Sequence, residues 1–473
     1  MTRSAAVFDL DRTLLRGASG PVITAALRAE GVLPDRSIPG EGLIYRIFDL
    51  IGETRPSMML TRQAARAAAG WSSAAVRQAG ERAADLLVGE VPGYARLLVE
   101  EHRAAGRPLV LATTTPRDLV EPLAERLGFD AVVATRYLER DGVYQGGIDG
   151  EFVWGKGKLR AVAEWAVGAD VDLAASWAYS DSFYDLPLLT AVAHPHAVNP
   201  DPRLAAVAAA RRWPLLWFDA PPGVPKLAGM EPQQMLFPFA RPELIPWARF
   251  DIDGVERIPA EGAALLVANH RSYLDPLAMG ITVARRGRPV RFLGKKEVFD
   301  APLVGPVATA MGGIRVERGS GSDQPLEAAT AALRAGDLVA ILPQGTIPRG
   351  RAFFEPELRG RWGAARLAAR ADVPVIPLGI WGTERAWPRS SRVPEVWNVV
   401  HPPTIRVRVG EPVELGRTDP DADTKAIMAA IVDLLPPEAR ERREPTADEL
   451  ARTFPAGYDG DPEAEVERRP GTD

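Results

Sequence analysis

The chain has 473 residues, 46% of them hydrophobic and 25% charged, which excludes a wholly disordered or collagen-like protein and allows two or three domains. Its formal net charge of −5 argues against general nucleic-acid binding. The lack of cysteine excludes disulfides, thiolate zinc sites and thiol nucleophiles.

The N-terminus and the apolar runs of the sequence predict a cytoplasmic location. The segment MTRSAAVFDLDRT enters a strand-like run directly, without the apolar region of a signal peptide. The longest apolar stretches, such as 263–268, are far shorter than the roughly 20 residues that cross a bilayer. We therefore expect a cytoplasmic protein, at most peripheral on the inner face of the cell membrane.

Residues 1–218 show alternating strand and helix patterns. AAVFDL, RPLVLATTT and the weaker SWAYSD predict strands, and helical stretches such as 122–127 and 158–167 separate them. Such alternation favours a parallel sheet, whose ligand sites lie beyond the carboxyl ends of the strands. The Ala/Arg/Leu-rich region at about 17–90 is too long for a simple crossover, and we predict that it forms a helical cap.

A change of composition marks a boundary after residue 218. Residues 219–249 are rich in proline and glycine and predict a linker. ALLVAN, PVRFLG, LVAILP and VPVIPLGIW then predict buried strands of a second α/β domain, which we place at 250–435. Residues 436–473 are charged and poor in apolar side chains, so we expect this tail to be disordered.

The linker carries side chains that suit a membrane interface. It combines aromatic bodies with cationic heads: Phe237, Phe239, Trp247, Phe250, Arg241 and Arg249. Prolines at 238, 242 and 246 argue against one long amphipathic helix. Packing of the same residues between the two domains is an equally open alternative.

Acidic and phosphate-binding residues follow the predicted strands of the first domain. They are Asp9 and Asp11 in the motif DLDRT, then Thr113, Lys158, Asp181 and Asp185. One carboxylate can attack phosphorus and a second can protonate the leaving oxygen, while a lysine and a hydroxyl hold the phosphoryl oxygens. An all-oxygen site of this kind suits magnesium. Taken singly, each residue is also compatible with helix capping or a solvated position.

In this order, these residues resemble the haloacid-dehalogenase superfamily of phosphatases, in its phosphoserine-phosphatase-like branch with a helical cap. The resemblance covers roughly 5–218 and implies a Rossmann-like domain. It implies that Asp9 is the nucleophile that forms an aspartyl-phosphate, and that Asp11 is the general acid and then the base. Thr113 and Lys158 would bind the phosphoryl group. Magnesium would be held by Asp9, the backbone carbonyl of Asp11 and Asp181, with Asp185 in support.

The second domain contains a histidine and an aspartate five residues apart. ALLVANHRSYLDP places His270 at a strand end and Asp275 in the first turns of the next helix. The imidazole can take a proton from a hydroxyl while the carboxylate holds its tautomer. Without a cysteine or a GxSxG elbow, direct attack by an acceptor alcohol is simpler than an acyl-enzyme. The alternative is a purely structural role, in which the histidine caps the following helix.

Later blocks give the second domain a resemblance to the glycerolipid acyltransferase family typified by 1-acylglycerol-3-phosphate acyltransferases. The blocks are GKKEVF with Lys295 and Lys296, GGIRVER with Arg318, LPQGT with Gly345 and Thr346, and the strand VPVIPLGIWG. The resemblance covers roughly 250–415 and implies that His270 is the base and Asp275 its partner. Arg318, Lys295 and the turn at 345–346 would bind the phosphate of a lysophospholipid acceptor. The acyl donor would be acyl-CoA or acyl carrier protein.

One block departs from the usual family pattern Pro-Glu-Gly-Thr-Arg. Here Gln344 replaces the glutamate and Ile347 replaces the arginine. The loss of a guanidinium removes a bidentate phosphate partner, and Arg349 is a candidate substitute. The departure leaves the His/Asp chemistry untouched and puts in doubt that the acceptor is phosphorylated.

Together the two domains predict a bifunctional enzyme of glycerophospholipid synthesis. It would acylate lysophosphatidate to phosphatidate and hydrolyse a phosphomonoester with magnesium. In one alternative, the phosphatase acts on a lipid phosphate and the acyltransferase acylates the dephosphorylated alcohol towards diacylglycerol. In another, the first domain hydrolyses a small metabolite such as phosphoserine or is a non-catalytic regulator. The complete acidic set argues against a regulator.

Overall fold

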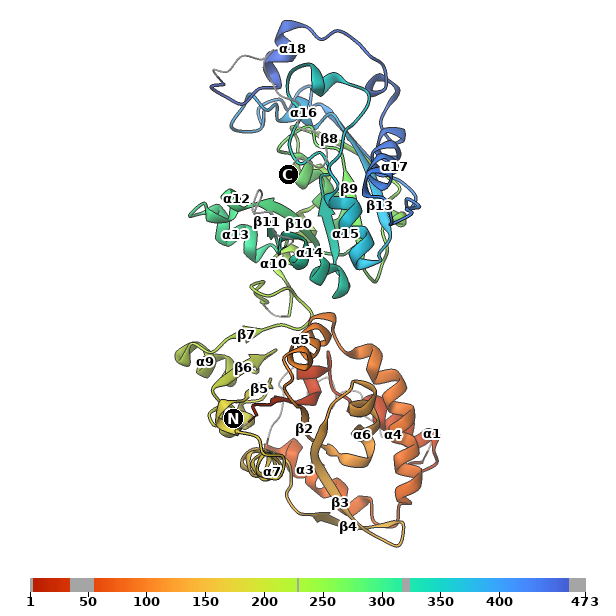
Figure 1. Ribbon diagram of the computed structural model, residues 1–473, viewed down its shortest axis with the longest axis vertical. Coiled ribbons are helices and arrows are strands. Elements are labelled where there is room, and N and C mark those ends of the chain that lie inside the picture. The colour runs from red at the N-terminus through yellow and green to blue at the C-terminus, as the bar shows by residue number, and fades with distance from the viewer. Residues whose placement is uncertain (1–2, 35–54, 228, 317–323, 459–473) are drawn as a thin grey trace. The chain divides into compact units, whose positions relative to one another are not determined.

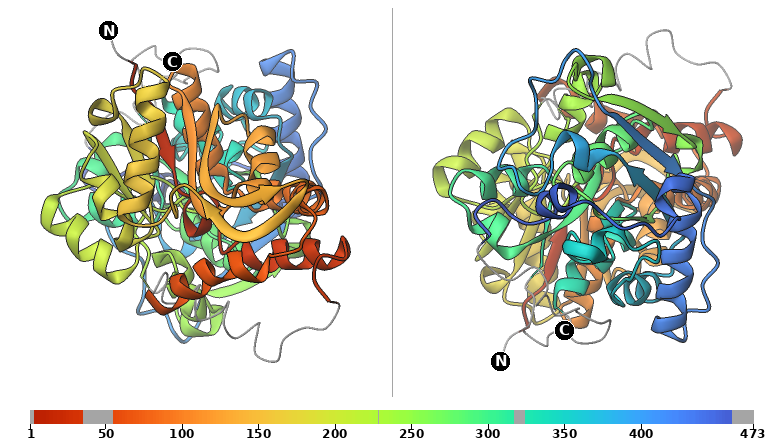
Figure 2. Two further views of the ribbon diagram at one scale, coloured as in Figure 1. Left: turned by 90° about the horizontal axis from the view of Figure 1, so that it is seen from below. Right: turned by 90° about the horizontal axis from the view of Figure 1, so that it is seen from above.

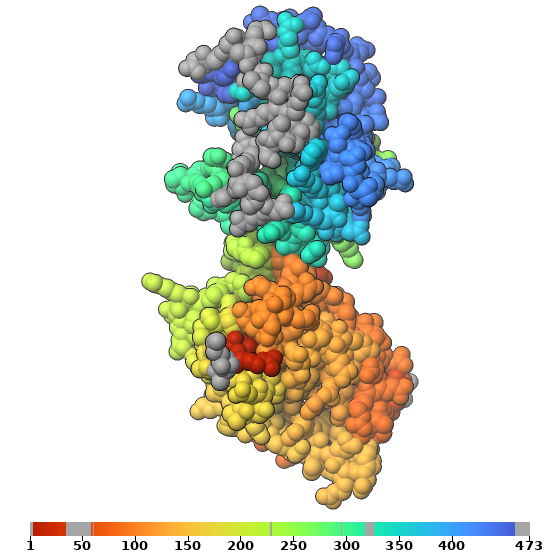
Figure 3. Space-filling model, in the orientation of Figure 1, coloured from red at the N-terminus to blue at the C-terminus, as the bar shows by residue number. Residues whose placement is uncertain are grey.

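The structure, a computed structural model, describes residues 3–34, 55–227, 229–316 and 324–458. The chain divides into two compact units, Met1–Pro222 and Gly223–Asp473, coloured red to yellow-green and green to blue in Figures 1 and 3. Within these residues, each unit is built on a seven-stranded sheet, which confirms the predicted pair of α/β domains. None of the described helices is long and apolar enough to cross a membrane.

The sheet of the first unit gathers its sequence motifs at one edge. Its strand order is β4-β3-β2-β1-β5-β6-β7, and only the β3–β4 pair is antiparallel. The strands are β1 (Ala6–Phe8), β2 (Leu109–Pro116), β3 (Ala131–Arg140), β4 (Val143–Asp149), β5 (Trp177–Ser180), β6 (His194–Val198) and β7 (Leu215–Leu216). Because parallel strands point the same way, the residues after β1, β2 and β5 emerge at the same edge.

Helices cover both faces of this first sheet (Figures 1 and 2). Along β1, Ala6 and Phe8 pack into one apolar cluster and Val7 packs into the other, because successive side chains of a strand point to opposite faces. The helices are α1 (Gly20–Ala29), α3 (Arg55–Ala67), α4 (Ser73–Leu87), α5 (Gly93–Ala104), α6 (Arg117–Arg126), α7 (Lys156–Gly168), α8 (Leu186–Leu189) and α9 (Pro202–Arg211). The described part of the expected cap at about 17–90 is therefore helical.

The second unit has a sheet of order β11-β10-β12-β9-β13-β14-β8, in which only β13–β14 is antiparallel. Its strands are β8 (Arg249–Asp253), β9 (Ala264–Ala268), β10 (Val290–Lys295), β11 (Ile314–Val316), β12 (Leu338–Ile341), β13 (Val375–Trp381) and β14 (Thr404–Val409). Its helices are α10 (Pro232–Leu236), α11 (Asp275–Ala284), α12 (Lys296–Asp300), α13 (Val304–Ala310), α14 (Gln324–Arg334), α15 (Gly363–Ala371), α16 (Thr383–Ala386), α17 (Pro420–Asp433) and α18 (Ala447–Arg452). The central strand β9 is buried on both faces.

Most of the segment that we assigned to a linker belongs to the second unit. Glu231 makes a bidentate ion pair of 2.5 and 2.8 Å with the fully buried Arg291 of β10. Trp247 and Phe250, two of the aromatics with a predicted interfacial role, pack against the core of this unit. A buried arginine requires a paired carboxylate, so this ion pair holds the segment against the sheet.

Part of the tail that we expected to be disordered forms the helix α18. A capping box between Thr446 and Glu449 starts this helix. Thr453 Oγ1 accepts a 2.8 Å hydrogen bond from the Gly350 backbone N–H, and Phe454 is buried. The prediction from composition was wrong for α18 because this helix has no broad apolar face. Its cap and a few buried side chains next to it stabilise it instead. Residues 459–473 lie outside the described residues.

Candidate functional site

Lys158 lies between two of the expected acidic residues at the carboxyl edge of the first sheet. Its Nζ donates hydrogen bonds of 2.7 Å to Asp9 Oδ1 and 2.6 Å to Asp185 Oδ2. Asp9 follows β1, Asp185 follows β5, and Lys158 comes from the first turn of α7. The lysine side chain is 2% exposed, so these two carboxylates provide the negative charge that its burial requires.

The same edge contains more negative than positive charge. Asp181 follows β5 and lies 3.5 Å from Arg12 Nε, and it accepts a 3.3 Å hydrogen bond from Thr13 Oγ1. Among the motif residues and their ion-pair partners, the buried or half-buried groups are four carboxylates and two cations: Asp9, Asp11, Asp181 and Asp185, and Arg12 and Lys158. Buried like charges repel, so a divalent cation would stabilise this arrangement.

The oxygen atoms available here fit magnesium. Asp185 Oδ1 is buried and has no hydrogen-bond partner within the described part of the chain. The expected ligand set has only two carboxylate side chains, Asp9 and Asp181, with the backbone carbonyl of Asp11. Among the described residues, no group of three or more metal-ligating side chains occurs. This donor set is still suitable, because magnesium retains several waters and needs few protein carboxylates.

Asp11 lies in an environment suited to a general acid. Burial raises the pKa of its carboxyl above the usual value, although hydrogen bonds from Ser19 and Thr115 oppose this effect. Thr115 Oγ1 donates to Asp11 Oδ2 at 3.4 Å, and the Ser19 backbone N–H donates to Oδ1. A carboxyl that keeps its proton more readily can deliver it to a leaving oxygen.

Thr113 lies within β2, three residues before the strand ends at Pro116, and is almost fully buried. Its Oγ1 accepts a 3.2 Å hydrogen bond from the Thr115 backbone N–H. The structure thus places the four expected aspartates just after β1 and β5, Thr113 in the second half of β2 and Lys158 at the start of α7.

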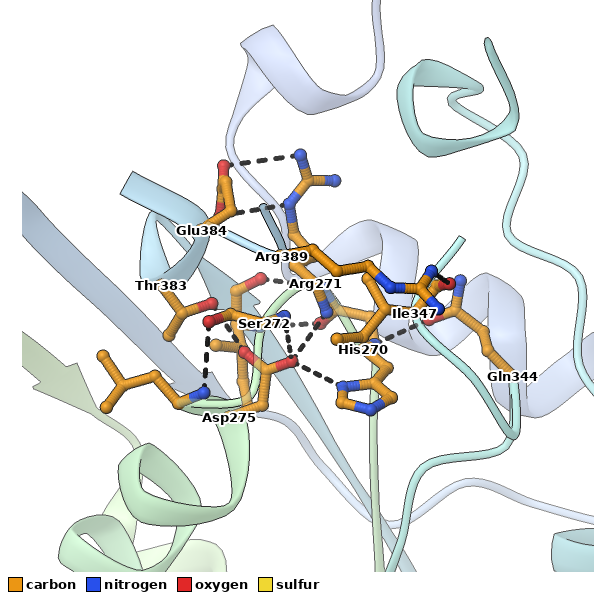
Figure 4. A network of polar contacts seen from close by, with 12 residues as sticks. His270, Arg271, Ser272, Asp275, Gln344, Ile347, Thr383, Glu384 and Arg389 are labelled. Carbon is orange, nitrogen blue, oxygen red and sulfur yellow. Dashed lines mark hydrogen bonds and ion pairs between the residues drawn. The ribbon is translucent and has the colours of Figure 1, made fainter. Parts of the chain in front are cut away.

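In the second unit, Asp275 holds the imidazole of His270 (Figure 4). Asp275 Oδ2 lies 2.8 Å from His270 Nδ1 and accepts backbone hydrogen bonds of 2.6 and 2.8 Å from Arg271 and Ser272. Its other oxygen accepts a 2.5 Å hydrogen bond from Thr383 Oγ1. Asp275 is fully buried at the start of α11, whereas the His270 side chain is 16% exposed. With Nδ1–H bound to Asp275, Nε2 has its lone pair available for a proton.

The two unusual residues of the PQGTI block have distinct environments (Figure 4). Gln344 Oε1 accepts a 2.6 Å hydrogen bond from the His270 backbone N–H, so the amide retains an acceptor where a glutamate would have one. Ile347 is buried, and its carbonyl accepts a 2.6 Å hydrogen bond from Arg389. Arg349 lies over the ring of Tyr458, at 5.5 Å, which does not support it as the substitute guanidinium.

Comparison with known proteins assigns both units to families. The family model for haloacid dehalogenase-like hydrolases matches residues 6–190, and the acyltransferase model matches residues 249–381. A Streptomyces azureus protein described as "Inhibition of morphological differentiation protein" is 35% identical over 224 residues, 47% of this chain and 80% of that relative. The chain belongs to the haloacid dehalogenase-like hydrolase family. Its second unit carries an acyltransferase domain.

Further similar proteins match one domain each. A phosphoserine phosphatase of Mycobacterium tuberculosis is 32% identical over 218 residues, 46% of this chain and 71% of that protein. The solved 1-acyl-sn-glycerophosphate acyltransferase PlsC from Thermotoga maritima has 20% sequence identity and a TM-score of 0.33, and the match covers 43% of this chain and 78% of that one. The predicted membership of both families is confirmed by the two family models.

The residues expected to bind the acceptor phosphate are only partly described. Lys295 ends β10, but its side chain lies outside the described parts, and so does the whole of Arg318. Gly345 has φ of +73°, and a Cβ there would lie 3.0 Å from the Arg361 side chain, so the turn requires glycine. Thr346 is half-buried beside it.

Sequence reasoning missed residues that position the acyltransferase pair. Asn269 joins the ends of β9 and β13, because its side chain donates to Ile380 O and accepts from Ile380 N, both at 2.8 Å. Thr383, 108 residues from Asp275, supplies a hydrogen bond to the carboxylate. Asn269 could have been noticed because it precedes the histidine at a strand end, whereas nothing in the sequence marked Thr383.

A cavity of about 410 Å³ borders the acyltransferase site at Arg271. The Arg271 guanidinium carbon lies 4.1 Å from the ring centroids of both Phe353 and Trp381. The tail contributes Arg443 and Arg452 to the cavity wall. The segment 437–454 therefore takes part in forming the surroundings of the second site.

Proposed function

We propose that the chain is a bifunctional enzyme that acylates lysophosphatidate to phosphatidate and hydrolyses a phosphomonoester. The contact between His270 Nδ1 and Asp275 Oδ2, at 2.8 Å, carries the acyltransferase half of the proposal. A buried carboxylate with four hydrogen-bond donors is a fixed support for the ring, which is what a general base requires.

In the acyl transfer, His270 Nε2 takes the proton of the acceptor hydroxyl. The hydroxyl oxygen then attacks the thioester carbonyl of acyl-CoA or acyl carrier protein, and the carbon–sulfur bond breaks. The proton returns from Nε2 to the thiolate that leaves. Asp275 keeps the proton on Nδ1 throughout and stabilises the imidazolium that forms between the two transfers.

In the phosphatase reaction, Asp9 attacks phosphorus and Asp11 gives its proton to the leaving oxygen. Asp11 then takes a proton from the water that hydrolyses the aspartyl-phosphate. Lys158 and Thr113 hold the phosphoryl oxygens, and Asp185 orients Lys158 through the 2.6 Å hydrogen bond. Magnesium bound by Asp9, Asp181 and the carbonyl of Asp11 would neutralise the phosphoryl charge.

Two alternatives each have a supporting observation. The burial of Ile347, where the family usually has arginine, favours an acyl acceptor without a phosphate, so that the phosphatase would supply a dephosphorylated lipid alcohol. The 32% identity to a phosphoserine phosphatase favours a small phosphomonoester as the hydrolase substrate. Both alternatives leave the roles of His270 and Asp9 unchanged.

One experiment tests the proposal and separates its variants. The pure protein is given labelled acyl-CoA with lysophosphatidate or with monoacylglycerol, with magnesium or with a chelator. With lysophosphatidate, labelled phosphatidate is expected in chelator, and labelled diacylglycerol formed from lysophosphatidate with magnesium would indicate that the phosphatase acts on the lipid. Release of phosphate from phosphoserine, lost in Asp9→Asn, would identify the small-metabolite variant. An absence of labelled lipid with both acceptors, or full transfer by His270→Ala, would refute the acyltransferase half.

A further inference from the structure

The loop between α16 and β14 exposes a cluster of large apolar side chains. Trp397 is 91% exposed and Val400 is 75% exposed, and Val393 and Val399 are also exposed. Water-exposed tryptophan and valine side chains close together in sequence are unfavourable in water and mark an interaction surface. The loop lies beyond residue 381, where the match to the acyltransferase family ends.

Hydrogen bonds hold the base of this loop, so its apolar tip projects from a defined support. Trp387 Nε1 donates to Ser391 O at 3.1 Å, and Ser391 Oγ donates to Val393 O at 2.6 Å. The Glu395 backbone N–H donates to Ala386 O at 2.8 Å.

The base of the loop is also attached to the catalytic segment. Ser272 Oγ donates a 2.6 Å hydrogen bond to Trp387 O, and the Tyr273 and Trp387 rings meet edge to face at 5.8 Å. Ser272 and Tyr273 lie between His270 and Asp275 in the sequence. The loop that carries the apolar tip therefore starts at a residue in contact with the segment that carries the proposed base.

The charges of the loop favour an anionic lipid surface over other partners. Glu395 is the only charged residue of 393–400, and Arg452 neutralises it at 3.0 Å. Arg392, next to the apolar tip, is exposed, and no ion pair to it is found in the described part of the chain. Apolar side chains with a tryptophan and an adjacent cation are the combination that binds at the interface of anionic membranes.

We propose that the loop 393–400 docks on an anionic lipid surface through Trp397, Val399 and Val400. The inference rests on the proposed function in so far as the acyl acceptor is a membrane lipid. The chain's own segment 459–473 is a poor alternative cover, because it contains only one large apolar residue, Val466, among many charged ones. Docking would present the His270 segment to acceptors that lie in the membrane.

Vesicle co-sedimentation of the full chain tests this inference. The vesicles contain phosphatidylcholine alone or phosphatidylcholine with phosphatidylglycerol. We expect Trp397→Ser/Val400→Ser to lower the partition constant on anionic vesicles by about tenfold or more. Arg392→Gln is expected to weaken binding on anionic vesicles only. Val167→Ser, which changes an equally exposed valine of the first unit, is the matched control and should bind as the wild type does.

The outcomes separate docking from catalysis. Acyl transfer to a short-chain acceptor below its micelle concentration should be the same in Trp397→Ser/Val400→Ser and in the wild type, which also shows that the variant is folded. Unchanged vesicle binding by this variant overturns the docking proposal, and so does a wild type that binds neither vesicle. A wild-type dimer that the variant converts to monomers, with vesicle binding unchanged, would assign the loop to a second copy instead. If the variant loses vesicle binding but the wild type itself shows no acyl transfer, the docking proposal stands and only the proposed function is refuted.

Discussion

The side-chain oxygen of Gln344 accepts a 2.6 Å hydrogen bond from the backbone N–H of His270. This contact joins two motif blocks that lie 74 residues apart and orients the backbone of the proposed base. The amide does here what a carboxylate oxygen would do, so the replacement of the usual glutamate preserves the geometry of the His270 segment.

The first prediction concerns Gln344. Gln344→Glu keeps the acceptor oxygen, and we expect acyl-transfer activity within about threefold of the wild type. Gln344→Leu leaves the His270 N–H without its acceptor, at a cost of roughly 1–3 kcal/mol, and should lower the rate about tenfold. Steady-state acyl-transfer rates check both variants. Equal rates for Gln344→Leu and Gln344→Glu would mean that the contact does not position the base.

Thr383 provides a second test of the same site. Thr383→Val removes the 2.5 Å hydrogen bond to Asp275 and leaves one oxygen of a buried carboxylate without its donor. Acyl transfer should fall about tenfold, because the lost hydrogen bond is worth roughly 1.5 kcal/mol or more. Phosphatase activity should stay constant. Thr404→Val, at an exposed position, is the control, and a similar loss in both variants would contradict the role of Thr383.

Lys158 should be needed for the stability of the hydrolase domain as well as for its activity. Lys158→Met leaves Asp9 and Asp185 buried without their shared cation, which is expected to cost about 3–5 kcal/mol. Thermal unfolding should show a lower midpoint for the hydrolase domain, together with the loss of phosphate release. The control Lys156→Met changes an exposed lysine two residues away and should unfold like the wild type.

His102 should make the hydrolase domain less stable at acidic pH. Burial, with a smaller effect of the Arg107 charge, lowers the pKa of His102 from 6.5 to about 4. The unfolded chain therefore binds a proton below pH 6.5 that the folded domain takes up only near pH 4. Stability should fall by up to about 3 kcal/mol as the pH drops through this window, and His102 should contribute no pH dependence above it.

Denaturant unfolding of the wild type and His102→Gln at pH 4 to 7.5 measures this contribution. His102 hydrogen-bonds Tyr179 at 2.8 Å, so the variant starts from a lower stability at neutral pH. The informative quantity is the difference between the two curves, which should shrink as the pH falls. Parallel curves across the window would show that His102 is not the titrating group.

Local sequence patterns were sufficient to predict the α/β architecture and to identify the charged residues of the two sites. The short apolar runs that were predicted as strands correspond to β1, β2 and β5, and the acidic motifs follow β1 and β5. This works because buried strands of a parallel sheet are short apolar segments and because their carboxyl ends share one edge. The histidine and aspartate five residues apart likewise lie where they were predicted, His270 just after β9 and Asp275 at the start of α11.

Contacts between distant parts of the chain were invisible to these patterns. Nothing near Thr383 or Arg389 indicated that they contact Asp275 and Ile347, since those contacts depend on how β13 and its following loop return to β9. The composition of 219–249 gave no sign of the ion pair between Glu231 and Arg291, and the composition of the tail gave no sign of the hydrogen bond between Gly350 and Thr453.

The sequence by itself determined which side chains are available for chemistry, since residue type and periodicity are local properties. The tertiary structure decided which partners those side chains have. Lys158 donates hydrogen bonds to both Asp9 and Asp185, and Asp275 accepts a hydrogen bond from Thr383, 108 residues away. Such pairings are set by the path of the chain through two sheets, where a buried charge or polar atom must find its partner wherever the fold places one.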